Sequence, residues 1–363
     1  MNNKLQCKVY LSDEGYGHIV RQSAILEGLL KLMPETTFTV QTHKHLDAVS
    51  RIIPGVDTID KFNNISWQKK ANGSPDVPNI KIQFNNYLED SERYIAEELD
   101  LPTPDFILSD LVYEAFEIGA IKSIPAFGVA HFTWDWFFSK LYPPPLTTSV
   151  MDRFFAMAMK SKTLYFPPFT PEEILVHYKK NSMEVPLILR SEILQKRVDS
   201  KGKFKVMIID SGAGVLSKSV KKALHQARTL DDYEFYVSSK FRVEQANVSF
   251  IDEHELLVDY IGDMDLVIGR AGFNTISECI GLRTPMLLLG EAMNPEMNEN
   301  IITLKKQHLG SFISMETFEN EIDSFLPSFI AHEYKFIAES MRNHTIATNG
   351  ADVIAKDIQE KLA

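Results

Sequence analysis

A histidine that follows two glycines stands near the N-terminus, in the run Gly15-Tyr16-Gly17-His18. The run joins an apolar segment to an amphipathic one, so we place His18 at the start of a helix, with the glycines clearing space before it. A helix N-terminus disfavours the charged imidazolium, which keeps the ring able to accept a proton near pH 7. This pattern predicts a general base that removes a proton from an attacking hydroxyl. The alternative is a histidine that only caps the helix.

An aspartate ends a later apolar run, Phe106-Ile107-Leu108-Ser109-Asp110. Because the carboxyl ends of parallel strands meet at one edge of a sheet, Asp110 can approach the second ring nitrogen of His18 and fix its tautomer. The two residues therefore predict a His–Asp dyad. Simple helix capping by Asp110 is the alternative.

A second strand-to-helix turn lies in the C-terminal half, where residues 269–278 read Gly-Arg-Ala-Gly-Phe-Asn-Thr-Ile-Ser-Glu. Glycines permit a tight turn, and the backbone N–H groups of Asn274 and Thr275 can face an anion. Arg270 adds a fork of donors, and Glu278, one helical turn beyond Asn274, can accept from two ribose hydroxyls. The pattern predicts a pyrophosphate site. A plain turn capped by Asn274 or Thr275 is the alternative.

This run resembles the nucleotide-sugar signature of family 1 glycosyltransferases and of the peptidoglycan N-acetylglucosaminyltransferase, over residues 269–300. The resemblance implies that the diphosphate and the ribose are held by the matching residues, Arg270, Gly272, Asn274, Thr275 and Glu278. It also places Glu296 and Asn300 in the donor site, through an acidic–Gln–x–x–Asn element. Met297 replaces the glutamine and cannot donate to a hydroxyl, which leaves the sugar open.

The turn Ser211-Gly212-Ala213-Gly214 resembles the first glycine-rich turn of the family's donor domain. The resemblance assigns Gly212 and Gly214 to donor binding. A turn that glycine merely makes easy is the alternative.

The first turn resembles two further groups of proteins through the element Gly-x-Gly-His-x-x-Arg, which ends here at Arg21. These are the UDP-sugar hydrolases of the pseudaminic-acid pathway, in which the same histidine is thought to activate water, and the glycosyltransferase-like portion of arabinokinases. The family 1 resemblance supports His18 as base and Asp110 as its partner. Together, these resemblances leave two reactions open for the same motif, sugar transfer and hydrolysis.

The segment His131-Phe132-Thr133-Trp134-Asp135-Trp136 looks like the aromatic-Trp-Asp element of the arabinokinase-type portion. The resemblance implies an acceptor site, in which tryptophan faces can stack on a sugar. The acceptor-binding residues predicted in this way are Gly17, Arg21, Trp134, Asp135 and Trp136. A buried aromatic cluster is the alternative.

Short apolar runs alternate with amphipathic helical stretches in both halves, which predicts parallel sheets with helical crossovers. We expect strands at 8–12, 38–42, 106–110, 126–132, 204–210, 233–238, 265–269 and 286–289, and helices at 21–33, from about 217, from 274 and at 350–362. A stretch rich in proline and aromatic residues, 142–171, interrupts the pattern, and we expect a domain boundary after it.

The expected fold class is α/β. With the resemblance it becomes the GT-B fold, two Rossmann-like doubly wound parallel-sheet domains facing across a cleft. We expect an acceptor-binding domain at 1–185, a donor-binding domain at 186–345, and a C-terminal helix at 346–363 that packs back on the first domain.

The composition of the 363 residues excludes some functions, since 38 Lys and Arg against 49 Asp and Glu give a net charge of -11, which disfavours nucleic-acid binding. No signal pattern and no apolar run of about 18 residues is visible, so we expect a cytoplasmic protein without a transmembrane segment and leave peripheral membrane contact open. Cys7 and Cys279 are predicted to be buried apolar residues. Asp263-Met264-Asp265 precedes a predicted strand, and we expect no metal site.

The sequence therefore predicts a hexosyltransferase-type glycosyltransferase that moves a sugar from a nucleotide-sugar to an acceptor hydroxyl by a metal-independent inverting mechanism. UDP is the family default, and a UDP-sugar co-substrate is the only cofactor expected. The alternatives are a nucleotide-sugar hydrolase with the same histidine and a non-catalytic nucleotide-sugar-binding protein. The sugar, the nucleotide, the acceptor and the oligomeric state stay open.

Overall fold

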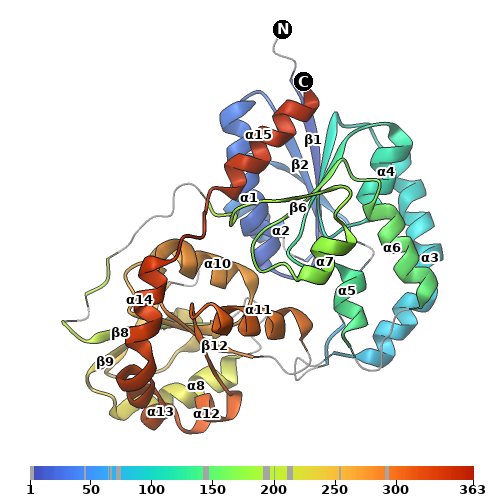
Figure 1. The fold of residues 1–363 in the computed structure, drawn as a ribbon. Helices are drawn as coiled ribbons and strands as arrows, with labels where there is room; N and C mark the ends of the chain where they lie inside the picture. Colours follow the sequence, from blue (N-terminus) through green and yellow to red (C-terminus); the bar gives the residue numbers. More distant parts are fainter. Residues whose placement is uncertain are drawn as a thin grey trace. The chain divides into compact units, whose positions relative to one another are not determined.

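The computed structural model describes residues 4–363 except 45, 64, 66–67, 71–74, 142–146, 191–196, 200, 211–215, 253–254 and 291–293. The chain divides into two compact units. Unit 1 comprises Met1–Ser191 and Ala347–Ala363, and unit 2 comprises Glu192–Ile346. Each unit contains one parallel sheet with helices packed on it (Figure 1).

The sheet of unit 1 has seven parallel strands in the order β3-β2-β1-β4-β5-β6-β7. The central strands β1 and β4 are buried almost throughout, as expected where helices cover both faces of a sheet. The strands are β1 (Gln6–Leu11), β2 (Thr37–Thr42), β3 (Asp57–Asp60), β4 (Phe106–Asp110), β5 (Ala126–Val129), β6 (Thr163–Phe166) and β7 (Ser182–Glu184). The helices are α1 (Tyr16–Leu32), α2 (Leu46–Ile52), α3 (Val77–Leu99), α4 (Glu114–Lys122), α5 (Trp134–Ser139), α6 (Thr148–Ala158), α7 (Glu172–His177) and α15 (Gly350–Leu362).

Three neighbouring strands of this sheet end at the same level. Leu11 at the end of β1 pairs with Asp110 at the end of β4, and Asp110 pairs with Val129 at the end of β5. The loops that follow these strands therefore leave the sheet side by side. They carry Asp13, the segment after Asp110, and His131.

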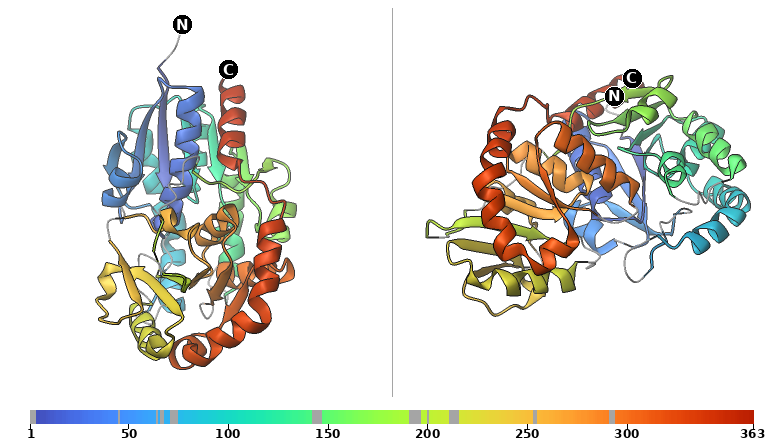
Figure 2. Two further views of the ribbon diagram at one scale, coloured as in Figure 1. Left: turned by 90° about the vertical axis from the view of Figure 1, so that its left-hand side faces the viewer. Right: turned by 60° about the horizontal axis from the view of Figure 1, so that its bottom comes forward.

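The C-terminal helix α15 packs against α1, although more than 300 residues separate them in the sequence (Figures 1 and 2). The contact is close because α1 has a glycine there: a Cβ on Gly28 would lie 3.1 Å from both the carbonyl oxygen of Ala351 and the Cβ of Ala355. Ile354 and Ile358 of α15 are fully buried in the same core. The predicted terminal helix is confirmed with its bounds.

The sheet of unit 2 has six parallel strands in the order β10-β9-β8-β11-β12-β13. The strands are β8 (Phe204–Ile209), β9 (Tyr233–Ser238), β10 (Val248–Ile251), β11 (Leu266–Arg270), β12 (Met286–Leu289) and β13 (Ser311–Ile313). The α-helices are α8 (Ser217–Gln226), α9 (Val258–Ile261), α10 (Phe273–Leu282), α11 (Pro295–Lys306), α12 (Met315–Asn320), α13 (Ile322–Phe329) and α14 (Lys335–Asn343). Shorter turns are η1 (Ala227–Thr229), η2 (Ser239–Phe241) and the π-helical η3 (Ile330–Tyr334).

The sequence prediction missed the edge strands of both sheets. It was also wrong to expect that the proline-rich stretch 142–171 interrupts the alternation of strands and helices. Strands β3, β7, β10 and β13 each have only three or four residues and carry polar or partly exposed side chains, so no apolar run marks them. The proline-rich stretch does not end the alternation, because it contains α6 and β6, and β6 pairs with β5 in the same sheet. Helix α1 begins at Tyr16, five residues before the predicted start at Arg21.

Two smaller expectations have clear outcomes. Cys7 and Cys279 are both buried, as predicted. Asp263 accepts a hydrogen bond from Nζ of Lys205, and Asp265 accepts one from the backbone N–H of the same residue.

Within the described ranges, no helix combines the length and the apolar character that a membrane span requires.

Candidate active site

The predicted pair of histidine and aspartate is present in unit 1. His18 lies in the first turn of α1, and its Nδ1 is 2.7 Å from Oδ1 of Asp110, the last residue of β4. A carboxylate only accepts hydrogen bonds, so Nδ1 carries a proton, and in the neutral ring the lone pair is then on Nε2. Asp110 does not cap the next helix, because the residue before α4 is Tyr113 and no side chain caps it. The geometry is that of a base whose tautomer a buried carboxylate holds.

Arg21, which the sequence assigned to the acceptor, binds the same carboxylate in this structure. Its Nε lies 3.0 Å from Oδ2 of Asp110, and its Nη2 lies 2.5 Å from Oδ1. The side chain is 2% exposed. The reason is helical spacing: Arg21 follows His18 by three residues on α1, so both side chains leave the helix on one face and meet Asp110.

The charges around Asp110 keep it ionised. Burial by itself would raise the pKa of this carboxyl, but the nearby Arg21 guanidinium and His18 imidazole outweigh burial and hold the pKa of Asp110 well below its usual range. The carboxylate therefore remains an acceptor for the Nδ1–H of His18 throughout the neutral range.

The sequence analysis assigned no role to two residues of this cluster, Gln22 and His131. The Nε2 of Gln22 lies 3.4 Å from Oδ2 of Asp110, and Nη1 of Arg21 lies 2.9 Å from Nδ1 of His131. A guanidinium only donates, so His131 accepts at Nδ1 and carries its own proton on Nε2. The signal that could have found His131 is its place two residues after β5, a strand that ends level with Asp110.

Asp13 fixes the turn that precedes α1. Its buried carboxylate accepts hydrogen bonds from Thr42 Oγ1 at 2.8 Å and from the backbone N–H groups of His43, Lys44 and Asn63 at 2.7, 3.0 and 3.1 Å. These donors belong to the end of β2 and to the loops after β2 and β3. One carboxylate thus ties three neighbouring loops together and holds the approach to His18 in place.

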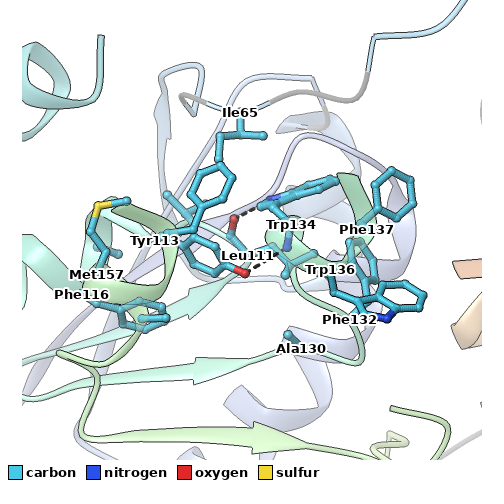
Figure 3. Packing of buried hydrophobic residues seen from close by; sticks show 14 of the residues in the cluster. Ile65, Leu111, Tyr113, Phe116, Ala130, Phe132, Trp134, Trp136, Phe137 and Met157 are labelled. Carbon is cyan, nitrogen blue, oxygen red and sulfur yellow. Dashed lines mark hydrogen bonds between the residues drawn. The ribbon is translucent and has the colours of Figure 1, made fainter. Parts of the chain in front are cut away.

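The tryptophans of α5 lie in the core, which agrees with the alternative of a buried aromatic cluster. Trp134 is 1% exposed, stacks on Phe138 with ring centroids 5.3 Å apart, and donates from Nε1 to the carbonyl oxygen of Leu111 at 3.0 Å (Figure 3). Trp136 is also buried, and its Nε1 donates to Glu173. The ring of Trp134 is packed against Phe132, Phe137 and Phe138, and Nζ of Lys140 lies over the ring of Trp136, 5.8 Å from its centroid.

The remaining predicted acceptor residues are distributed differently. Asp135 is buried and accepts a hydrogen bond from the hydroxyl of Tyr178 at 2.9 Å, so it stabilises the aromatic cluster. Gly17 is the second residue of α1 and is partly exposed beside His18. Of the five residues, only Gly17 keeps an open position next to the base.

The turn of unit 2 has the predicted form. Arg270 ends β11 and is buried, Gly272 is the N-cap of α10, and Asn274 and Thr275 stand in the first helical turn. The cap residue has extended backbone geometry, and no side chain caps the helix, so the alternative of Asn274 or Thr275 as cap is not observed. A Cβ on Gly272 would meet nothing within 4 Å. Among the described residues there is therefore space beside Gly272 at the N-terminus of α10.

A buried polar group at this turn has no hydrogen-bond partner among the described residues. The side-chain nitrogen of Asn274 is buried and donates to no group in the part of the chain that the structure describes. Buried polar groups nearly always have a hydrogen-bond partner, so an orphan beside a helix N-terminus indicates a ligand position. Glu278 lies one turn further along the same helix and is partly buried.

The two α11 residues predicted to bind the donor, Glu296 and Asn300, contact different parts of the turn before α10. Glu296 lies in the first turn of α11, and its Oε1 accepts from the backbone N–H of Phe273 at 3.4 Å. Asn300 is 1% exposed, and its Nδ2 donates to the carbonyl oxygen of Ala271 at 2.9 Å. Glu296 thus lies at the N-terminus of α10, whereas Asn300 binds the backbone of the turn that precedes this helix. Met297 is buried.

Gly212 and Gly214 lie outside the described residues. Next to them, Asp210 accepts hydrogen bonds from the backbone N–H of Leu216 at 3.2 Å and from the hydroxyl of Ser217 at 3.1 Å. Its carboxylate also lies 3.7 Å from Nζ of Lys240. Asp210 therefore joins the end of β8 to the start of α8.

Comparison with known proteins shows a family similarity for the C-terminal part of the chain. Residues 204–358 match the model of the glycosyltransferase family 28 C-terminal domain. Two curated relatives, both named UDP-N-acetylglucosamine--N-acetylmuramyl-(pentapeptide) pyrophosphoryl-undecaprenol N-acetylglucosamine transferase, are 27% identical over 175 residues in Oceanobacillus iheyensis and 28% identical over 163 residues in Thermosipho africanus. The alignments cover 43% and 44% of this chain and 49% and 47% of the relatives, so the chain spans about half the length of the curated relatives it matches.

Solved structures resemble the chain over nearly its whole length. The glycotransferase of kitacinnamycin has a TM-score of 0.67 at 13% identity and covers 99% of this chain and 100% of its own. The spinosyn rhamnosyltransferase SpnG has a TM-score of 0.66 at 12% identity, with 97% and 100% covered. The chain therefore has the two-domain GT-B fold of glycosyltransferases, and its residues 204–358 are similar to the C-terminal domain of glycosyltransferase family 28.

Proposed function

We propose that this chain is a glycosyltransferase that moves a sugar from a nucleotide-sugar to an acceptor hydroxyl, with inversion at the anomeric carbon and without a metal ion. The observation that carries the proposal is the His18–Asp110 pair, because it leaves one imidazole nitrogen ready to take a proton at the carboxyl edge of a parallel sheet. The GT-B fold and the family 28 match support it.

In the proposed reaction, Nε2 of His18 takes the proton of the acceptor hydroxyl as that oxygen attacks the anomeric carbon. The bond from the anomeric carbon to the diphosphate breaks at the same time, and the nucleoside diphosphate leaves with the electron pair. Attack from the side opposite the leaving group inverts the configuration. Asp110 stabilises the imidazolium that forms and holds the ring in its orientation.

The turn before α10 supplies the electrostatic part of the proposal. The open N-terminus of α10, the buried Arg270 and the unpartnered amide of Asn274 suit a diphosphate, which accepts hydrogen bonds and carries negative charge. These groups would stabilise the leaving diphosphate as a divalent cation does elsewhere. Glu278 would accept from the ribose hydroxyls, and Glu296 from a sugar hydroxyl.

The names of similar proteins suggest which donors to test first. The curated relatives are named for UDP-N-acetylglucosamine as donor, and one solved structure of SpnG is a complex with thymidine diphosphate. We therefore propose UDP-sugars as the first set of donors and thymidine diphosphate sugars as the second.

The test is turnover of a panel of these donors, with and without sugar and small-molecule acceptors, followed by release of the nucleoside diphosphate. We expect release that depends on an acceptor, and a product with inverted anomeric configuration by NMR. Rapid stoichiometric release of free sugar without acceptor would instead identify the hydrolase, with the same histidine activating water. Binding of the donor without any turnover would identify a binding protein.

The base is tested with His18→Ala, for which we expect a loss of about 10²–10⁴-fold in kcat. His43→Ala is the matched control, because His43 is also a histidine paired with an aspartate, Asp60, but both side chains are exposed. Unchanged turnover in His18→Ala would remove His18 as the base.

A further inference from the structure

The guanidinium of Arg21 reaches the three other titratable side chains of the buried cluster in unit 1. It binds both carboxylate oxygens of Asp110, at 3.0 and 2.5 Å. Its Nη1 lies 2.9 Å from Nδ1 of His131 and donates to it, whereas its Nη2 lies 3.2 Å from Nδ1 of His18, which cannot accept while its own N–H donates to Asp110. If Arg21 served only to balance the charge of Asp110, contacts with the carboxylate would suffice. Because Arg21 also lies next to two imidazoles, its charge can act on their protonation.

We infer that Arg21 is a positioning residue of the base: it fixes Asp110 as the acceptor for Nδ1–H of His18 and opposes a second proton on that ring. The inference rests on the proposed function, in which His18 must be neutral before it accepts the acceptor's proton. It goes beyond that function because it assigns a task to a residue that touches neither substrate.

The argument is electrostatic. A carboxylate paired with an imidazole alone stabilises the imidazolium, and an imidazolium has no lone pair to act as a base. A guanidinium on the same carboxylate repels that second positive charge at short range, and water cannot screen the repulsion in a buried cluster. The pair can then orient the ring through Asp110 without drawing a proton onto it.

The groups that face His18 come from three elements. Arg21 and the neutral Gln22 lie on α1, Asp110 ends β4, and His131 follows β5. Two further carboxylates, Asp13 and Glu14, precede His18 in the turn before α1, and that of Asp13 is bonded to the end of β2 and to the loop after β3. Arg21 is thus the cation that opposes the charge of Asp110 in the described contacts of this cluster.

The same contacts set the tautomers of both histidines. Asp110 requires the proton of His18 on Nδ1, and Arg21 requires the proton of His131 on Nε2. Two neighbouring imidazoles are therefore held in opposite tautomers by one ion pair. This arrangement can be measured without any substrate.

The experiment is a pH titration of the imidazole nitrogens by ¹⁵N NMR in the full chain, which has 10 histidines. His18→Gln and His131→Gln assign the two signals. In the wild type we expect Nδ1–H for His18 and Nε2–H for His131. In Arg21→Met we expect the midpoint of His18 protonation to rise by about one pH unit or more, a tenfold gain in proton affinity. Arg21→Lys keeps the charge, so its midpoint should stay near that of the wild type.

Two outcomes would overturn the inference. One is a folded Arg21→Met variant with the wild-type His18 midpoint, which would leave Arg21 a packing role only. The other is the Nε2–H tautomer of His18 in the wild type, and this outcome does not depend on whether a variant folds. Because the titration needs no turnover, the expected NMR result together with absent transfer would refute the proposed function and leave this inference standing.

Discussion

Three side chains of α1 converge on Asp110, and this convergence makes one residue sensitive to both pH and substitution. His18, Arg21 and Gln22 all lie within hydrogen-bond distance of its carboxylate. The carboxylate is fully buried, so its charge must be balanced by these neighbours and not by water. Removal of either charge of the ion pair leaves the other buried without compensation.

We expect Asp110 to make the stability of unit 1 depend on pH in the acid range. The folded-state pKa of Asp110 is lowered from its ordinary value of 3.8, so the folded chain binds this proton less readily than the unfolded chain. The stabilisation is therefore fully present above about pH 4 and is lost as the pH falls toward the folded pKa. Urea titrations followed by tryptophan fluorescence, from about pH 7 to pH 3, measure the effect.

Asp110→Asn is the matched variant for this titration. It should be less stable than the wild type at pH 7 by about 3–5 kcal/mol, because Arg21 keeps its buried charge and loses its partner. Its stability should also fall less steeply with acid. The carboxyl of Glu98, whose pKa is also lowered, remains in both proteins, so the difference isolates Asp110. An equal acid dependence in the two proteins would contradict the prediction.

At this scale the sequence predicted the central pair but not its surroundings. His18 and Asp110 could be found because each stands at a strand end of a predicted parallel sheet, and such ends meet at one edge. Arg21 was assigned to the acceptor because a motif shows spacing but does not show which way a helical face turns. Trp134 was ambiguous for the same reason, since an aromatic residue after a strand suits both a core and a sugar site.

At the scale of elements, helix α15 is held to unit 1 by backbone contacts as well as by its apolar face. The N–H of Gly350, the first residue of α15, donates to the carbonyl oxygen of Leu187 at 2.9 Å. The N–H of Leu187 donates in turn to the carbonyl oxygen of Ala347, also at 2.9 Å. The chain thus re-enters unit 1 along a short paired segment before the helix begins.

We expect Gly350→Ala to weaken this docking. An added Cβ would overlap the carbonyl oxygen of Pro186, and backbone on both sides cannot move away easily. Overpacking of this kind costs about 1–3 kcal/mol, although alanine is the better helix former. Thermal unfolding measured by circular dichroism tests it, with the exposed Lys356→Ala on the same helix as control. A Gly350→Ala variant at least as stable as the wild type would show that the junction is loose.

The elements themselves were predictable to the extent that apolar runs mark them. The central strands of both sheets were found because both faces are covered, which makes their sequences apolar throughout. The edge strands were missed because a neighbour is present on one side only and polar residues are tolerated there. Helix α1 was placed too late because glycines stand in its first turn and break the periodic pattern.

For the whole molecule, the division into two units gives each turn its own scaffold. Unit 1 carries the cluster around His18, and unit 2 carries the turn before α10. The net charge of -11 makes local groups such as Arg270 and helix N-termini the means by which such a chain can hold a phosphate. Nucleotide binding should therefore stabilise unit 2 more than unit 1.

The distribution of tryptophan allows this to be measured. All 3 tryptophans lie in the first 191 residues, so tryptophan fluorescence reports the unfolding of unit 1, while far-UV circular dichroism reports both units. A nucleotide at about 100 times its Kd should stabilise the unit that binds it by about 2.7 kcal/mol. We expect UDP to move a dichroism transition to higher urea while the fluorescence transition stays in place.

The amide of Asn274 supplies the control for this experiment, because its nitrogen is a buried donor at the turn before α10 for which the described residues offer no acceptor. In Asn274→Ala the shift caused by UDP should shrink, while the stability without UDP should change little, since no hydrogen bond within the described chain is lost. A fluorescence transition that moves while the dichroism of unit 2 does not would place the nucleotide in unit 1. The assignment of the donor site to the turn before α10 would then be wrong, whatever the identity of the sugar.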